Sequence, residues 1–192
     1  MDPILRKINK EWTLFLDRDG VINRRLPDDY VKEWNDFVFL PGVLHAISIF
    51  TQYFGNIFIV TNQQGIGKGL MTESQLADIH REMLAKIEAH GGKISRIYHC
   101  PELRDSGSVF RKPEIGMGMQ AKKDFPEVDF KRSMMAGDTL SDLQFAHNLK
   151  MLGILIGNDS HCLSHRPVLY HLHFECLQSF ANKLVQENKY NQ

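Results

Sequence analysis

The sequence lacks a surplus of charge of either sign. Its 192 residues include 23 Lys and Arg and 23 Asp and Glu, so the formal net charge is zero, and no basic run occurs anywhere in the chain. Binding along a nucleic-acid backbone requires several Lys or Arg contacts to phosphates. The composition therefore argues against a nucleic-acid partner and favours a small ligand.

Cysteines and long apolar runs are also scarce. The three cysteines, Cys100, Cys162 and Cys176, are odd in number and widely spaced, which favours free thiols in a reducing compartment over a disulfide framework. No uncharged run approaches the roughly 18 residues of a membrane span. The first residues also lack the apolar stretch of a secretory signal. We therefore expect a cytoplasmic protein with no membrane partner.

What the chain does contain is typical of one globular domain. Hydrophobic residues make up 43% and charged residues 24% of the sequence, close to the averages for folded proteins. The length is sufficient for one substantial core. No repeat, low-complexity tract or linker interrupts it. We expect residues 1–192 to form a single domain, as a monomer.

Short apolar runs that end abruptly in polar residues recur along the chain and are typical of buried parallel strands. They occupy residues 12–16, 56–60, 94–98, 133–136 and 151–156. Helical patterns lie between them: one opens at Pro41 and stops at Gly55, and another begins with a capping box at Thr72 and ends at Gly91. The alternation predicts an α/β fold, a Rossmann-like three-layer sandwich with a mainly parallel sheet. Residues 24–40 are predicted to form a short flap above the first strand.

Polar side chains follow these strands at or just after their ends. They are Asp17 and Asp19, Thr61 and Asn62, Arg111 and Lys112, and Asp138 and Asp142. Ligands of parallel sheets bind outside the carboxyl ends of the strands. We therefore expect these eight residues to converge on one crevice.

The residue types in this set indicate phosphate chemistry. Clustered carboxylates repel one another unless a cation lies among them, and oxygen ligands without nearby His or Cys favour a hard ion such as Mg²⁺. Lys112 and a hydroxyl can bind the other oxygens of a phosphate and neutralise its charge. A carboxylate that faces the phosphorus can act as the nucleophile.

Four segments, in this order, resemble the motifs of the haloacid dehalogenase superfamily of phosphohydrolases: FLDRDGVIN, VTNQQGIGKG, RKPEIGM and MAGDTLSD. The resemblance extends over roughly residues 12–157. It implies that Asp17 is the nucleophile that forms an aspartyl-phosphate, and that Asp19 is the general acid and then the base. It also implies that Thr61 and Lys112 bind phosphoryl oxygens. The implied Mg²⁺ ligands are Asp17, the backbone carbonyl of Asp19, and Asp138, with Asp142 in support.

The amino-acid sequences of the first three motifs are similar to those of heptose 1,7-bisphosphate phosphatases and the related histidinol-phosphate phosphatases. This likeness implies that Asn62, Arg111 and Lys112 contact phosphate or substrate, and that the flap around Tyr30 closes the site. Many members carry a zinc loop, with Cys-x-His early and Cys-x-Cys before the Arg-Lys-Pro. Here only Cys100 matches, so we expect no structural zinc.

The resemblance implies an Mg²⁺-dependent phosphomonoester hydrolase that acts on a small phosphorylated metabolite. The intervals between the motifs leave no space for a large cap domain, which favours hydrolysis over retained phosphoryl transfer. The leading substrate is a heptose 1,7-bisphosphate, which loses its 7-phosphate. The alternatives are a histidinol-phosphate phosphatase, a phosphatase of nucleic-acid ends, or a catalytically silent scaffold.

Two further patterns favour structural roles. The glycines from Gly65 to Gly69 do not form a nucleotide loop, because Asn62 stands where a Walker motif needs glycine and no Ser or Thr follows Lys68. We interpret them as a tight passage from strand to helix. The histidine-rich segment fits no zinc signature, and its members are His161, His165, His171 and His173.

Overall fold

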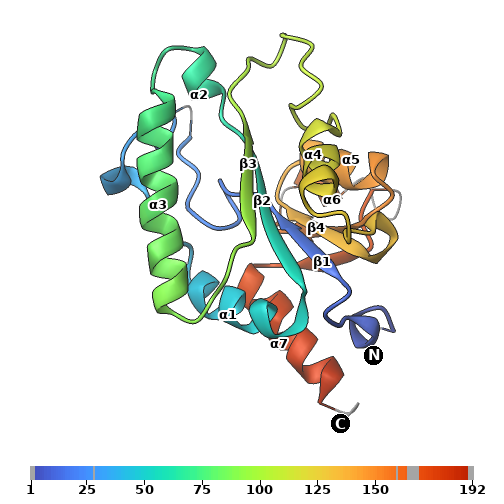
Figure 1. Ribbon diagram of the computed structural model, residues 1–192. Helices are drawn as coiled ribbons and strands as arrows, with labels where there is room; N and C mark the ends of the chain where they lie inside the picture. The colour runs from blue at the N-terminus through green and yellow to red at the C-terminus, as the bar shows by residue number, and fades with distance from the viewer. Residues whose placement is uncertain (1–2, 28, 159, 164–168, 190–192) are drawn as a thin grey trace.

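The computed structural model describes residues 3–27, 29–158, 160–163 and 169–189. Its centre is a parallel sheet of six strands in the order β3-β2-β1-β4-β5-β6 (Figure 1). The strands are β1 Thr13–Leu16, β2 Asn56–Asn62, β3 Arg96–Cys100, β4 Ser133–Gly137, β5 Leu152–Ile156 and β6 Leu172–Phe174. The predicted α/β fold with a parallel sheet is confirmed.

Helices connect the strands and cover both faces of the sheet (Figure 1). They are α1 Val43–Tyr53, α2 Gln64–Gly67, α3 Glu73–Ala89, α4 Gly116–Asp124, α5 Leu140–Asn148, α6 Ser160–Leu163 and α7 Leu177–Asn188, with 3₁₀ turns η1 Leu5–Lys7, η2 Trp34–Asp36 and η3 Phe130–Arg132. The helix α3 begins at the predicted capping box, where Thr72 Oγ1 accepts a hydrogen bond from the amide of Gln75 at 3.2 Å. None of the helices among the described residues has the length and apolar character needed to span a bilayer.

Alternate residues of the central strands point to opposite faces, as the two-residue period of a strand requires. Leu14 and Leu16 of β1 pack in the core beneath α1, α3 and α7. Phe15, between them, packs in a second core with Met117 of α4 and Phe145 of α5. All three β1 side chains are fully buried. Because β1 is buried on both faces, its sequence is a continuous apolar run without alternating polar residues.

The strand order reverses between β1 and β4, which pair directly, with Leu16 opposite Ala136. The chain moves outward to β2 and β3 on one side and to β5 and β6 on the other. In open α/β sheets, such a reversal leaves a crevice at the carboxyl ends of the strands. Asp17 directly follows β1 and Asp138 directly follows β4, so the topology places both carboxylates at this point.

Two strands differ by more than one residue at an end from the sequence-based expectation, whereas β1, β4 and β5 differ by a single residue. β2 continues through Thr61 and Asn62, and β3 covers residues 96–100 instead of 94–98. The two extensions pair with each other, with Thr61 opposite His99 and Asn62 opposite Cys100. β3 lies at the edge of the sheet and is partly exposed, so its limits are set by pairing with β2 and not by an apolar run.

The segment of residues 24–40, called the flap here, leaves the carboxyl end of β1 and returns to the same place. The amide of Arg24 bonds to the carbonyl of Val38 at 2.8 Å, which ties the two ends together. Within the flap, the rings of Trp34 and Phe37 stack with centroids 5.1 Å apart, and Phe37 is buried in the core beneath α1 and α3. The base of the flap is therefore fixed by packing.

The histidines near the carboxyl terminus contact the backbone. The ring nitrogen Nδ1 of His171 lies 3.2 Å from the amide of Gly153, from which it accepts a hydrogen bond. The Nε2 atom of His173 lies 2.7 Å from the carbonyl of Gly157. Both contacts join β6 and its approach to β5, as a structural role requires. His165 lies outside the described residues, and the side chain of His161 is not among those described.

Candidate active site

A pocket of about 550 Å³ lies at the carboxyl ends of β1 and β2. Seven of the eight residues predicted to converge line it: Asp17, Asp19, Thr61, Asn62, Arg111, Lys112 and Asp142. The eighth, Asp138, lines a neighbouring hollow that shares Arg25 and Thr139 with the pocket. The structure therefore brings together residues that are up to 125 positions apart, from Asp17 to Asp142.

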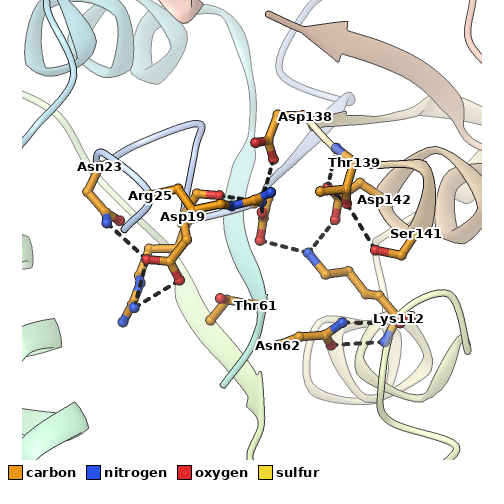
Figure 2. Close-up of polar contacts among 12 residues, drawn as sticks. Asp19, Asn23, Arg25, Thr61, Asn62, Lys112, Asp138, Thr139, Ser141 and Asp142 are labelled. Carbon is orange, nitrogen blue, oxygen red and sulfur yellow. Dashed lines mark hydrogen bonds and ion pairs between the residues drawn. The ribbon is translucent and has the colours of Figure 1, made fainter. Parts of the chain in front are cut away.

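The buried amino group of Lys112 links two carboxylates (Figure 2). Its Nζ atom is 2.8 Å from Asp17 Oδ1, 2.6 Å from Asp142 Oδ1 and 2.6 Å from the carbonyl of Val60. Burial alone would lower the pKa of Lys112, but Asp142 and Asp17 raise it above its ordinary value. Lys112 is therefore a fixed positive charge that donates hydrogen bonds to Asp17 and to the carbonyl of Val60 and forms an ion pair with Asp142.

Asp17, Asp138 and Asp142 form an acidic cluster, with one ligand atom from each residue within 4.8 Å of the others. Burial and then the charge of Asp142 raise the pKa of Asp17 to about 6. Burial and then the charge of Asp17 raise the pKa of Asp138 to about 8. Mutual repulsion of this kind is relieved by a cation. An all-oxygen donor set fits a hard divalent ion such as Mg²⁺.

The turn after β1 depends on a glycine. Gly20 has a φ of +98°, and a Cβ atom placed on it would lie 2.0 Å from Asp138 Oδ2. Any larger residue would therefore meet both backbone strain and a clash with one of the clustered carboxylates. Glycine at this position lets the turn approach Asp138 closely.

The carboxylate of Asp19 is held by three donors. It accepts hydrogen bonds from Arg18 Nη2 at 2.9 Å, from Asn23 Nδ2 at 2.9 Å and from Gln63 Nε2 at 2.8 Å. Burial would raise the pKa of Asp19, but Arg18 and these hydrogen bonds hold it below its ordinary value. The arrangement therefore favours the ionised form of Asp19.

Arg18 is itself almost completely buried. Its Nη1 atom lies 3.2 Å from Nε2 of His80 on α3. Burial, followed by the charge of Arg18, lowers the pKa of His80 to about 3. A neutral His80 can accept a hydrogen bond from the guanidinium, so α3 helps fix the group that holds Asp19.

Thr61 and Asn62 end β2 at the floor of the pocket. Thr61 Oγ1 accepts a hydrogen bond from Gln63 Nε2 at 2.8 Å, which leaves its own hydroxyl proton available for an anion. Asn62 Oδ1 accepts from the amide of Lys112 at 3.0 Å, and its Nδ2 donates to the carbonyl of Lys112 at 3.1 Å (Figure 2). Asn62, expected to contact substrate, thus has both polar atoms bonded to the backbone of Lys112.

Arg111 lines the pocket. Its Nη1 atom donates to the carbonyl of Glu102 at 3.0 Å, within the loop that follows β3. Burial lowers the pKa of Arg111 below its ordinary value. In this loop, Ser108 stands where many relatives of the resembled subfamily carry a zinc-binding cysteine, and its hydroxyl lies 3.8 Å from the sulfur of Cys100.

Several residues of the site were not identified from the sequence. They are Arg18, Asn23, Arg25 and Gln63. Arg18, Asn23 and Gln63 lie within the quoted motifs, close in sequence to Asp19 and Thr61. This proximity is a signal from which they could have been identified as site residues. Arg25 lies two residues beyond the first motif on a flap rich in charged residues. No spacing rule distinguishes it from Arg24.

Comparison with known proteins gives a consistent result. Residues 13–152 match the family described as polynucleotide kinase 3 phosphatase. The chain is 38% identical over 146 residues to a D-glycero-alpha-D-manno-heptose-1,7-bisphosphate 7-phosphatase of Mycobacterium tuberculosis, covering 76% of this chain and 77% of the relative. It is 39% identical over 150 residues to the protein of the same name from Campylobacter jejuni, covering 78% and 84%.

Solved structures agree with these relatives. The fold is similar, with a TM-score of 0.83 and 33% identity, to the D,D-heptose 1,7-bisphosphate phosphatase from B. bronchiseptica complexed with magnesium and phosphate, covering 92% of this chain and 99% of the other. It is also similar to a putative HAD-like phosphatase from Mesorhizobium loti, with a TM-score of 0.75 and 25% identity, covering 93% and 86%.

Proposed function

Because the chain belongs to the family described as polynucleotide kinase 3 phosphatase and is a phosphatase of the haloacid dehalogenase superfamily, we propose that it removes the 7-phosphate of a D-glycero-D-manno-heptose 1,7-bisphosphate. The membership confirms the resemblance that the four motifs predicted. The observation that carries the proposal is the convergence of Asp17, Asp19, Thr61, Lys112 and Asp138 at one edge of the sheet, in a chain similar to heptose bisphosphatases over three quarters of its length.

The proposed reaction has two steps on Asp17. In the first, a carboxylate oxygen of Asp17 attacks the phosphorus, the bond between phosphorus and the sugar oxygen breaks, and Asp19 gives its proton to that oxygen. In the second, Asp19 takes a proton from water as the water oxygen attacks the aspartyl-phosphate. The bond to Asp17 then breaks and inorganic phosphate leaves. Both residues return to their starting forms.

The partners of Asp19 suit the second step best. Three donors stabilise its carboxylate, which is the form that accepts a proton from water. Donation in the first step requires a protonated side chain, and the same donors oppose protonation. We infer that Asp19 turns away from at least one of these donors when it acts as the acid.

Lys112, which contacts Asp17 and Asp142 of the acidic cluster, and Thr61 are proposed to bind the phosphoryl oxygens. Asp17, the backbone carbonyl of Asp19, and Asp138 are proposed to hold Mg²⁺, with Asp142 supporting them through its ion pair with Lys112. Bound Mg²⁺ would neutralise the charge that spreads over the transferring phosphoryl group. Because only Cys100 remains of the subfamily's four zinc positions, we propose a site without structural zinc.

The rim of the pocket supports a substrate with two phosphates. Lys68, Arg104 and Arg111 line the same pocket as Asp17, and they supply positive charge beyond the group that would bind the reacting phosphate. On the flap, Tyr30 accepts a hydrogen bond from Gln64 at 2.9 Å, and Lys68 Nζ lies 5.4 Å from the centre of its ring. Tyr30 of the flap therefore borders the basic rim, where a second phosphate would lie.

One observation favours a second function. The matching family is described as polynucleotide kinase 3 phosphatase, which keeps a phosphatase of nucleic-acid ends as the alternative. The zero formal net charge argues against it, because binding of a phosphate backbone depends on several basic contacts. Histidinol phosphate remains an alternative small substrate.

The test is release of phosphate in the presence of Mg²⁺ from a panel of substrates. The panel contains both anomers of heptose 1,7-bisphosphate, heptose 7-phosphate, histidinol phosphate and an oligonucleotide with a 3′-phosphate. We expect the highest kcat/KM for a heptose bisphosphate, well above that for the 7-monophosphate. Preference for the oligonucleotide or histidinol phosphate would replace the substrate proposal.

A pair of variants tests the mechanism. Asp17→Asn keeps the size of the side chain and removes the nucleophilic oxygen, so we expect loss of activity by at least about 10³-fold. The matched control is Asp78→Asn on the surface of α3, which loses only an exposed ion pair with Arg81 and should keep full activity. Full activity in Asp17→Asn would exclude the aspartyl-phosphate.

A further inference from the structure

Arg25 extends from the flap into the space between the acidic residues (Figure 2). Its Nη2 atom donates to the backbone carbonyl of Asp19 at 2.8 Å and to Asp138 Oδ1 at 3.0 Å, and it lies 3.9 Å from Asp17 Oδ2. One nitrogen atom of the guanidinium thus faces three oxygen atoms from the ends of β1 and β4. The side chain remains 47% exposed, so it can withdraw toward solvent without disturbing the core.

These three oxygen groups are the ones proposed to hold Mg²⁺. The Nη2 atom of Arg25 lies within 3.9 Å of an oxygen atom from each of these groups: the carboxylate of Asp17, the carbonyl of Asp19 and the carboxylate of Asp138. A divalent ion needs oxygen ligands at about 2.1 Å. A guanidinium nitrogen and a metal ion therefore cannot occupy this position together.

We propose that Arg25 is the internal counter-cation of the metal-free site, and that Mg²⁺ binds by displacing it, so that metal loading is coupled to the position of the flap. This inference rests on the metal site of the proposed function. Without metal, the guanidinium offsets the repulsion among the clustered carboxylates. With metal, it is released toward the pocket that it also lines.

The base of the flap limits how far this movement extends. Arg24 is tied through its backbone to Val38, and Leu40 is tied to Ile22. The residues that follow Arg25, including Leu26 and Tyr30, line the substrate pocket. Displacement of Arg25 therefore changes the wall of the pocket without opening the fold. Because linkage is reciprocal, whatever holds Arg25 away from the cluster strengthens metal binding.

The neighbouring arginine provides a matched control. Arg24 is exposed and carries the same charge. Among the described residues, its side chain makes no hydrogen bond or ion pair, and its hydrogen bonds run through its backbone to Asn23 and Val38. Arg24→Gln and Arg25→Gln therefore make the same change in net charge, one residue apart, and only the second removes the competing cation.

The first measurement is calorimetric titration of the full, metal-stripped chain with MgCl₂ at low ionic strength. We expect Arg25→Gln to bind Mg²⁺ at least about fivefold more tightly than the unmodified chain, the lower end of ordinary coupling energies, and Arg24→Gln to bind within about twofold of it. Equal affinity in Arg25→Gln, weaker affinity, or an equal gain in both variants would overturn the proposal. So would the absence of Mg²⁺ binding in all three proteins.

Thermal unfolding closes the thermodynamic cycle. Arg25→Gln should lower the Tm of the metal-free protein, because the cluster loses its counter-cation, and should leave the Tm at saturating Mg²⁺ unchanged, because Arg25 is already displaced there. An equal loss of Tm in both conditions would contradict displacement. Neither measurement uses a substrate, so a protein that binds Mg²⁺ in this way but cleaves nothing in the panel would lose the proposed function and keep this role for Arg25.

Discussion

At the scale of single residues, the polar side chains of the site are fixed by partners within the chain. Asn62 is bonded twice to the backbone of Lys112, and Lys112 directs its amino group at Asp17 and Asp142. The charge that would bind the phosphoryl group is therefore positioned by the side-chain amide of Asn62, which holds the backbone of Lys112. This makes Asn62 a positioning residue whose removal acts through Lys112.

We expect Asn62→Ala to lower kcat by about tenfold or more, because even a 1 Å displacement of a catalytic group is costly. The stability of the fold should fall by about 1–3 kcal/mol, because the buried N–H and C=O groups of Lys112 lose their partners. Kinetics on the preferred substrate and urea unfolding measure both effects.

The matched control for this prediction is Asn148→Ala. Asn148 donates one exposed hydrogen bond to the carbonyl of Pro113, the residue after Lys112. Its loss should leave kcat within about twofold of the unmodified value, as for most surface substitutions. If the two variants lose kcat equally, the paired hydrogen bonds of Asn62 have no special role in positioning Lys112.

Residues that bear charge at the strand ends were predictable, and the groups that hold them were not. Asp17 and Asp138 are marked by abrupt ends of apolar runs, which any buried parallel strand shows. Arg18 is a charged residue whose burial depends on His80, 62 positions away on α3. The position of the Arg25 side chain beside Asp19 and Asp138 depends on the path of the flap. Such contacts are fixed by tertiary packing and leave no periodic signal in the sequence.

At the scale of elements, the turn that follows β1 controls how closely the loop approaches β4. Gly20 combines a positive φ with a Cβ position that overlaps the carboxylate of Asp138. We expect Gly20→Ala to displace Asp138, weaken Mg²⁺ binding by at least about tenfold and lower kcat, in line with losses on disturbing groups that orient metal ligands. Titration with MgCl₂ and steady-state kinetics measure these effects.

The control for strain is Gly91→Ala, after α3. Gly91 also has a positive φ, +78°, but a Cβ there would meet no atom within 4 Å. This substitution should cost about 1–2 kcal/mol of stability from backbone strain and leave metal affinity unchanged. Equal metal affinity in the two variants would show that the clash with Asp138 is relieved elsewhere.

The elements themselves were predictable to different degrees. Central strands such as β1 and β4 are buried on both faces, and their apolar runs located them almost to the residue. The edge strand β3 was placed two residues early, because only two of its five side chains are buried and its limits follow its pairing with β2. The capping box at Thr72 is a local signal and located the start of α3 correctly.

At the scale of the whole molecule, the reversal of strand order between β1 and β4 gathers acidic residues from distant parts of the chain. Asp17 and Asp142 are buried, and Asp138 lies beside them. The ionised forms of Asp17 and Asp138 are therefore disfavoured in the metal-free fold, because burial and the neighbouring carboxylates raise the pKa of both. The fold carries this cost because the same carboxylates are proposed to serve as nucleophile and metal ligands.

The sign of the resulting pH dependence follows from two raised pKa values. Asp17, at about 6, and Asp138, at about 8, both lie above the ordinary value of 3.8. Between pH 4 and 8, these groups bind more protons in the folded chain than in the unfolded chain. They therefore lower the free energy of unfolding as the pH rises. Asp19 has a pKa below its ordinary value of 3.8, so its contribution to the free energy of unfolding is nearly complete above about pH 5 and adds little to the pH dependence there.

Mg²⁺ should reverse this loss, because it binds the ionised carboxylates and its affinity grows as they lose protons. We expect the difference in Tm between samples with saturating MgCl₂ and samples with EDTA to be small at pH 5.5 and to increase steadily up to pH 8, as scanning calorimetry would measure. In Asp138→Asn, which removes one ligand and the carboxylate with the most strongly raised pKa, the difference should be smaller and nearly independent of pH above 7. A Tm difference that stays constant or shrinks as the pH rises would show that Asp17 and Asp138 do not form the metal site, because protons and metal would then not compete for the same oxygens.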